Sequence, residues 1–158
     1  IIFPLRINTK KKRVPIFIVL SAFTFNTVNG LFNGYNVQLN VSATHIFEFN
    51  IVLGALIFFI GMIINVTSDN KLISLSKEKM GYKIPNGKLF KYVSCPNYLG
   101  EIIEWFGFFI LVPSLASLSF LLWTSFNLIP RSINHHKWYR NKFKNYPKNR
   151  KAIIPFIL

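Results

Sequence analysis

Residues 51–64 read IVLGALIFFIGMII, without one polar side chain, and the polar stretch NVTSDN follows at 65–70. Extended to 46–66, this segment has the length of about 20 residues with which a helix crosses a hydrocarbon core about 30 Å thick. The whole chain has the same character, since 51% of its residues are apolar, 16% aromatic and only 15% charged. The sequence therefore predicts an all-α, polytopic integral membrane protein.

The positive charge of the chain is confined to three clusters. Nineteen Lys and Arg face five Asp and Glu, which gives a net charge of +14, and the basic residues lie at 6–13, 71–91 and 131–151. Lys and Arg next to membrane spans stay in the cytoplasm, so the basic loops and the C-terminus are predicted to be cytoplasmic. Each basic-free stretch between two clusters must then cross the membrane twice.

This topology predicts a helical bundle of about four transmembrane helices in two hairpins. The expected spans are residues 14–32, 46–66, 92–112 and 113–129. We expect a far-side loop near 29–45 in the first hairpin and a turn near Pro113–Ser114 in the second. The basic residues after 130 are expected to form a separate cytoplasmic C-terminal helix.

Several kinds of function are disfavoured by the composition. The single cysteine excludes a disulfide scaffold and a cysteine-rich zinc site, and no metal site is expected. The glycine-rich patterns that hold nucleotides in Rossmann folds and P-loops are missing. The basic clusters adjoin apolar spans, which favours contact with lipid headgroups over nucleic acid. Ser94, beside Cys95, lacks a nearby base in the sequence and is not expected to be a nucleophile.

Polar residues recur at helical spacing near the ends of the predicted spans. Ionisable side chains in a span cost about 2.5–3.5 kcal/mol and therefore tend to be paired and functional. The sets are Asn65 with Asp69, Asn97 with Glu101 and Glu104, and Arg131 with His135 and Tyr139. Residues four apart share a helix face, so each set forms one stripe at the cytoplasmic end of its helix. We expect the stripes to converge on one site, although helix caps and solvated interfacial residues would give the same spacing.

Residues 81–105 read GYKIPNGKLFKYVSCPNYLGEIIEW, HHKWY follows at 135–139, and the chain ends in YPKNRKAIIPF at 146–156. These blocks closely resemble the C-terminal domain of the steroid 5-alpha-reductases (3-oxo-5-alpha-steroid 4-dehydrogenases). The likeness covers nearly all of residues 1–158. It implies one NADPH-binding membrane domain that belongs to a larger seven-span fold.

The resemblance implies a multi-pass enzyme of the endoplasmic reticulum membrane that uses NADPH to reduce the 4,5 double bond of a 3-oxo-Δ4-steroid. Its implied partners are a steroid or sterol-like lipid and the bilayer, with no nucleic acid. The family's Glu and Tyr that bind the steroid carbonyl lie outside this chain, so its catalytic residues are unknown. The family's cofactor-binding positions correspond to Asn65, Asp69, Tyr82, Asn97, Glu101, Arg131, His135 and Tyr139. Arg150 matches a further basic position, and the Lys71–Lys91 segment would suit phosphates.

Two departures from the family pattern concern the phosphate-binding region. Gly87–Lys88 replaces a double glycine, and residues 72–77 lack the family's arginines, so Lys77 or Lys79 would have to replace them. The alternatives are a related reductase of long-chain enoyl-CoA or polyprenol, and a non-enzymatic membrane scaffold. A membrane methyltransferase of the isoprenylcysteine type is less favoured, because such enzymes have adjacent glutamates at the position of His135–His136.

Overall fold

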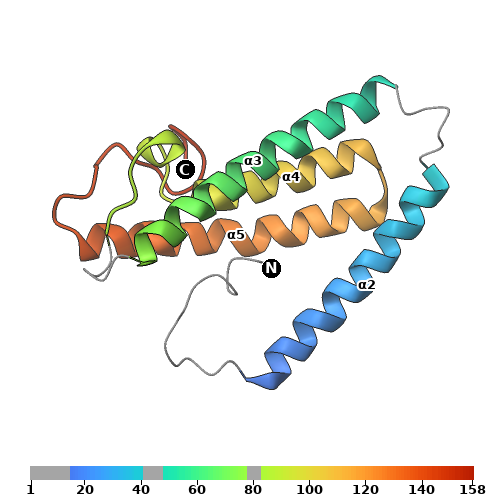
Figure 1. The fold of residues 1–158 in the computed structure, drawn as a ribbon, viewed down its shortest axis with the longest axis horizontal. Helices are drawn as coiled ribbons and strands as arrows, with labels where there is room; N and C mark the ends of the chain where they lie inside the picture. The colour runs from blue at the N-terminus through green and yellow to red at the C-terminus, as the bar shows by residue number, and fades with distance from the viewer. Residues whose placement is uncertain (1–14, 41–47, 78–82) are drawn as a thin grey trace.

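The computed structural model describes residues 15–40, 48–77 and 83–158. The described elements are α2 (Ile16–Asn40), α3 (Phe49–Lys77), the 3₁₀ helix η2 (Lys88–Lys91), α4 (Pro96–Leu111) and α5 (Leu115–Lys142) (Figure 1). An isolated bridge between Val93 and Lys151 is the only β pairing in this part of the chain. The predicted all-α fold class is confirmed.

Two described helices, Ile16–Leu39 and Phe49–Ser76, are long and apolar enough to cross a membrane. The predicted spans at 92–112 and 113–129 do not lie in helices that meet both the length and the apolar composition of a membrane span. Helix α4 has 16 residues and is therefore only about 24 Å long. It begins at Pro96 instead of residue 92, because residues 92–95 pair with the C-terminal segment. The structure thus supports a membrane helical protein with two candidate spans.

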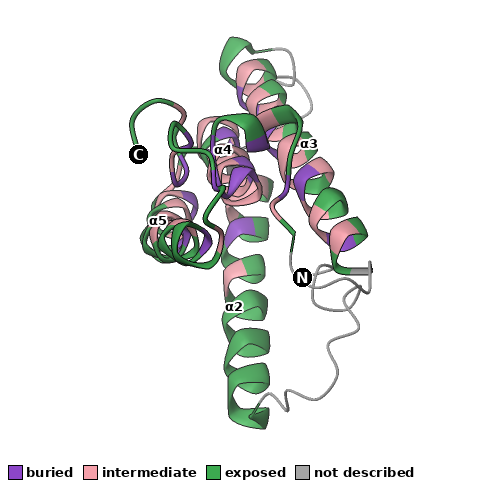
Figure 2. Ribbon diagram, turned by 90° about the vertical axis from the view of Figure 1, so that its left-hand side faces the viewer, coloured by how far each residue is buried: buried purple, intermediate pink, exposed green. Residues whose placement is uncertain are grey.

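Helix α2 extends well beyond the predicted end at residue 32. The far-side loop predicted at 29–45 is wrong for residues 29–40, which are helical, and residues 41–47 lie outside the described part. Asparagine side chains in this stretch donate to carbonyls of their own helix, Asn33 to Asn29 and Asn36 to Phe32. Helix α2 is almost entirely exposed (Figure 2), and its aromatic contact is with α5, where Phe25 stacks on Phe120.

Helices α3 and α4 run antiparallel in unusually close contact. Gly54 and Gly61 of α3 face Gly107 and Gly100 of α4, and a Cβ atom at any of the four would collide with the facing backbone. At Gly100 it would lie 2.5 Å from the backbone nitrogen of Asn65. Small residues at such positions allow two helix backbones to approach each other. This contact holds the polar end of α3 against the first turns of α4.

The turn predicted at Pro113–Ser114 is present between α4 and α5. Ser114 caps α5, because its hydroxyl oxygen accepts from the Ser117 amide at 3.1 Å while the Ser117 hydroxyl oxygen accepts from the Ser114 amide at 3.1 Å. Such a reciprocal capping box satisfies amides that would otherwise lack a partner.

Residues 131–142 are helical as predicted, but the prediction of a separate helix is wrong, because α5 continues through Pro130 to Lys142. A proline inside a helix removes one hydrogen bond and costs about 3 kcal/mol. The buried residues of α5 nevertheless follow one face on both sides of the proline: Ser117, Thr124, Leu128, Ser132 and Tyr139. Burial of this continuous stripe offsets the cost, so the helix is not interrupted.

Several of the most deeply buried side chains lie at one end of the bundle. Val93 and Ile153 have no exposed surface, and Phe90 is also buried. The C-terminal segment pairs with the chain before α4, since the Ser94 amide donates to the Lys151 carbonyl at 2.8 Å and the Lys151 amide to the Tyr92 carbonyl at 2.9 Å. This end of the bundle, where α3 ends, α4 begins and α5 ends, is therefore compact (Figure 1). It is called the base of the bundle below.

Candidate functional site

The polar stripes of three helices meet at this base. Asp69 of α3 and Asn97 of α4 are in direct contact, because the Asn97 Nδ2 donates to the Asp69 Oδ1 at 3.2 Å. Asn65 lies one turn earlier on α3, with its backbone against Gly100. All three side chains are half-buried. The glycine contact is thus the reason that these amide and carboxylate groups share one location.

Charged groups extend this cluster from α4 to α5. Glu101 interacts electrostatically with Asp69 and with Arg131 of α5. Tyr98 lies close enough to Arg131 to interact with it electrostatically, and its ring lies edge-on to His135 with ring centroids 6.1 Å apart. Arg131 and His135 are exposed, so their polar atoms are accessible to a ligand. Burial and the neighbouring Arg131 lower the pKa of His135, which favours the neutral imidazole at pH 7.

One of the predicted cofactor positions is not part of this cluster. Tyr139 is buried and its ring stacks on Tyr146, with centroids 5.4 Å apart. Although it shares a face with His135 by spacing, it packs into the base instead. Tyr82 lies outside the described residues, as do Lys79 and the side chain of Lys77.

A second polar network was missed by the sequence reasoning. The Ser94 hydroxyl lies 2.6 Å from His136 Nδ1 and 2.6 Å from the Tyr146 hydroxyl. The expectation that Ser94 has no nearby base is therefore wrong, because His136 is distant in sequence but adjacent in space. Ser94 is buried and its hydroxyl donates to the Lys151 carbonyl at 3.0 Å, which makes it a structural group. No local spacing signals a contact across 42 residues.

Arg150 occupies the centre of this second network. It is 3% exposed, and its Nη1 donates to the Pro85 carbonyl at 3.1 Å while its Nη2 donates to the Asn86 Oδ1 at 3.1 Å. Its guanidinium carbon lies 4.9 Å from the centroid of the Tyr146 ring, in cation–π geometry. Arg150 therefore joins the C-terminal segment to the chain before η2.

The His136 side chain in this network is expected to make the protein less stable at acidic pH. Burial, followed by the charges of Arg140, Arg150 and Lys151, lowers the pKa of His136 from its usual 6.5. The native state therefore favours the neutral ring, so this contribution is present above about pH 6.5 and is lost as the pH falls through the lower native pKa. We expect the unfolding midpoint to fall on acidification, and to fall less in His136→Asn. Identical pH profiles for the two proteins would contradict this role.

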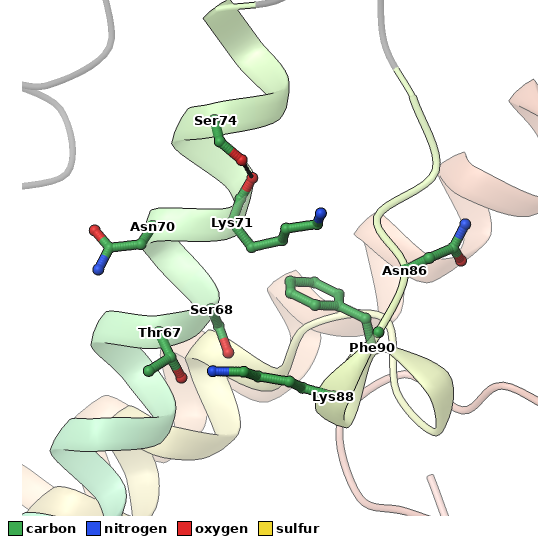
Figure 3. Close-up of a pocket in the computed structure, with 9 residues that line it drawn as sticks. Thr67, Ser68, Asn70, Lys71, Ser74, Asn86, Lys88 and Phe90 are labelled. Atoms are coloured by element: carbon green, nitrogen blue, oxygen red, sulfur yellow. Dashed lines mark hydrogen bonds between the residues drawn. The ribbon is translucent and has the colours of Figure 1, made fainter.

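A pocket of about 390 Å³ adjoins the cluster along α3, since Ser68 and Asn70 on either side of Asp69 are among its lining residues. It lies between the last turns of α3 and residues 86–90, and Lys71 and Lys88 are among its lining residues (Figure 3). In the described part of the chain, no group of three His, Cys, Asp or Glu side chains could hold a metal ion. The base therefore combines carboxylates, amides and cations, a set suited to a polar organic ligand with anionic groups.

The sequence is similar to those of known proteins. The sequence model of the 3-oxo-5-alpha-steroid 4-dehydrogenases matches residues 12–158. The chain belongs to this family. It is similar to steroid 5-alpha-reductase DET2 of Solanum lycopersicum, with 43% identity over 99% of this chain and 63% of that protein. It is also similar to 3-oxo-5-alpha-steroid 4-dehydrogenase 1 of Rattus norvegicus, with 42% identity over 100% of this chain and 62% of that protein.

The family match confirms the resemblance seen in the sequence blocks. It extends to the human 3-oxo-5-alpha-steroid 4-dehydrogenase 2, which is 40% identical over 90% of this chain and 58% of that protein. The chain therefore spans roughly three fifths of the length of these 3-oxo-5-alpha-steroid 4-dehydrogenases.

Proposed function

We propose that this chain is the NADPH-binding domain of an enzyme that reduces the 4,5 double bond of a 3-oxo-Δ4-steroid. The family membership supports the reaction class. The observation that carries the cofactor assignment is the convergence of Asp69, Asn97, Glu101 and Arg131 from three helices. Carboxylates and amides suit the hydroxyl and carboxamide groups of a dinucleotide, and a guanidinium suits its phosphates.

The residues of the cluster would have different roles in binding the cofactor. The bond from Asn97 to Asp69 fixes the orientation of the amide, so that its binding geometry exists before a ligand arrives. Tyr98 and Glu101 hold Arg131 at the edge of the cluster, where the guanidinium is exposed. NADPH would supply the hydride when bound, and the protein would supply its orientation and electrostatic environment. The steroid carbonyl would be polarised by residues outside this chain.

The membrane setting follows from the two candidate spans and the family membership. We propose a multi-pass protein of the endoplasmic reticulum, with the base on the cytoplasmic side. Arg131 and the other described Lys and Arg at 71–91 and 137–151 are clustered toward this end, which the positive-inside tendency places in the cytoplasm. A steroid substrate would enter from the lipid.

The reaction is tested by NADPH-dependent loss of enone absorbance in the full-length protein. Steroid enone, long-chain enoyl-CoA and polyprenal are offered as separate substrates. Turnover of the steroid enone is the expected result. Exclusive turnover of one of the other two would assign the chain to a related reductase, and no turnover of any would support a non-enzymatic role.

Glu101→Gln and Arg131→Met are expected to raise the Kd for NADPH about tenfold each, because each removes one charge-assisted interaction. Titration with NADPH in detergent micelles measures the change. Lys137→Met is the matched control, since Lys137 is an exposed cation of the same helix outside the cluster. Unchanged affinity in both cluster variants would refute the cofactor assignment.

A further inference from the structure

Residues 154–158 form an exposed apolar turn, called the C-terminal turn below. The side chains of Phe156 and Ile157 are 78% and 76% exposed. Tyr92, which precedes α4, extends this surface, because its exposed ring lies 5.6 Å from that of Phe156 between centroids. None of these residues belongs to the polar cluster at the base. The C-terminal turn is therefore an apolar surface that the proposed cofactor site does not use.

Hydrogen bonds hold the C-terminal turn in one conformation. The amides of Ile157 and Leu158 donate to the Ile154 carbonyl, at 3.2 Å and 3.1 Å. The amides of Ile153 and Ile154 both donate to the Leu158 carbonyl oxygen at 2.8 Å. Ile153 has no exposed surface, so the turn is anchored in the base. A fixed backbone, rather than a loose chain end, thus presents the apolar side chains.

The residue type at the tip of the turn does not suit a surface in water. Pro155 and Phe156 occupy its two central positions, and the φ angle of Phe156 is 67°, in the left-handed region. A turn with proline at the first central position and a positive φ at the second favours glycine or asparagine there. Phe156 is strained in this conformation and also has its ring exposed. Burial of the ring in an apolar phase outside the protein would offset both costs.

The C-terminal turn lies at the depth expected for lipid headgroups. The apolar run of α3 ends just before Asn65, whose backbone lies against Gly100 of α4. Helix α4 begins at Pro96, four residues before Gly100, and therefore about 6 Å beyond the end of that run. The headgroup region extends about 5–8 Å from the hydrocarbon core on each side of a bilayer. The Cys95 amide donates to the Ala152 carbonyl at 3.1 Å, so the chain reaches this level two residues before the turn.

The position of the turn in the bundle leaves it accessible from the side. Figure 2 shows the C-terminus at the outer edge of the bundle, on the side of α4 away from α3. In Figure 1 it lies at the level where α4 begins. The turn therefore projects sideways at the depth of the membrane surface.

The charges near the turn match an anionic membrane surface. The Lys91 ammonium lies 5.7 Å from the centroid of the Tyr92 ring, and the Lys91 side chain is exposed. Residues 79–100 and 105–158 contain no Asp or Glu. Basic side chains attract anionic headgroups, while adjacent aromatic and aliphatic side chains enter the boundary between headgroups and acyl chains. Lys91, Tyr92, Phe156 and Ile157 provide this combination in the order charge, ring, ring and aliphatic group.

We propose that the C-terminal turn is an interfacial anchor, in which Phe156 and Ile157 insert into the cytoplasmic leaflet while Lys91 contacts the phosphates of anionic lipids. This inference rests on the proposed membrane setting, with the base on the cytoplasmic side. The segment before the turn is hydrogen-bonded to residues 92–95, which lead directly into α4. The anchor therefore fixes the depth at which α4 begins and at which Asn97 is held.

The test measures the depth of a nitroxide label attached at Ile157→Cys in the full-length protein, in nanodiscs of phosphatidylcholine and phosphatidylserine. Cys95 is buried and does not take up the label, and any cysteine outside this chain is replaced by serine. Oxygen concentrates in the bilayer and a nickel chelate in water, so collisions with the two relaxants report depth. We expect the label at 157 to collide with oxygen and to lose its collisions with nickel. Asn149→Cys is the matched control, because Asn149 is exposed in the same segment and should remain in water.

Two variants, each carrying the label at 157, test the ring and the charge separately. Phe156→Gly removes the ring and suits the backbone of the turn, so the fold is retained while collisions with nickel return. Omission of phosphatidylserine is expected to move the label toward water, and Lys91→Met to abolish this dependence on lipid charge. Lys142→Met is the control for charge, since Lys142 is an exposed cation at the end of α5.

The outcomes separate this inference from the proposed function. If alkaline carbonate extracts the protein from membranes, the proposed membrane setting itself is wrong. If the protein stays integrated but the label at 157 collides with nickel as freely as the label at 149, only the anchor is refuted. A label at 157 that is shielded from both relaxants would show that protein covers the turn, which also overturns the inference. A depth that does not change with phosphatidylserine would overturn the role of Lys91.

Discussion

Arg150→Met is expected to lower the free energy of unfolding by about 3 kcal/mol, because hydrogen bonds of a charged group contribute about 1.5–3 kcal/mol each and their loss leaves a buried acceptor unpaired. The buried acceptor is the Pro85 carbonyl, and the second bond that is lost is the one to the side-chain oxygen of the exposed Asn86. Arg150 is almost fully buried, so water cannot replace the guanidinium. Denaturant titration in detergent micelles measures the change.

The matched control is Arg140→Met, since Arg140 is exposed on α5 and carries the same charge. It is expected to change the free energy of unfolding by less than about 0.5 kcal/mol. Arg150→Lys keeps the charge but loses the fork that reaches two acceptors, and should recover only part of the stability. Equal effects of Arg150→Met and Arg140→Met would contradict the bridging role.

Gly61→Ala and Gly100→Ala are expected to destabilise the protein by about 1–3 kcal/mol each, because the added methyl group has no space between the helix backbones. At Gly100 the new Cβ atom would lie 2.5 Å from the Asn65 nitrogen and 2.8 Å from the Gly61 carbonyl oxygen. Gly100 also lies between Asn97 and Glu101, so NADPH affinity should fall with stability. Thermal unfolding and NADPH titration measure the two effects.

The same substitution at Gly30 or Gly34 of α2 provides the control, since a Cβ atom there meets nothing within 4 Å. Alanine is the better helix former by about 1 kcal/mol, so these variants should be neutral or slightly stabilising. Replacing glycine by alanine is thus expected to destabilise the protein in α3 and α4 and to leave its stability unchanged or slightly raised in α2. Destabilisation of the same size at Gly30 and Gly61 would show that the close contact is not the cause.

Local patterns in the sequence predicted the helical class and much of the site. The apolar run at 51–64 determined α3, and the i, i+4 spacing placed Asn65 with Asp69 and Asn97 with Glu101. These predictions succeeded because helical periodicity and hydrophobic length are properties of neighbouring residues. The turn at Pro113–Ser114 was equally local, since a proline followed by a capping serine ends one helix and begins another.

The predictions that were wrong concern contacts between residues that are far apart in the sequence. The last span was predicted to end at residue 129, but tertiary burial on both sides of Pro130 kept α5 continuous. Tyr139 shares a face with His135 by spacing, yet stacking on Tyr146 draws it into the base. The sequence by itself determined which segments are helices and which of their faces are polar. Only the tertiary structure decided that Ser94 meets His136, that Arg150 joins Pro85, and that residues 86–90 lie opposite the last turns of α3. Contacts across many residues depend on how whole helices pack, and no local pattern encodes that packing.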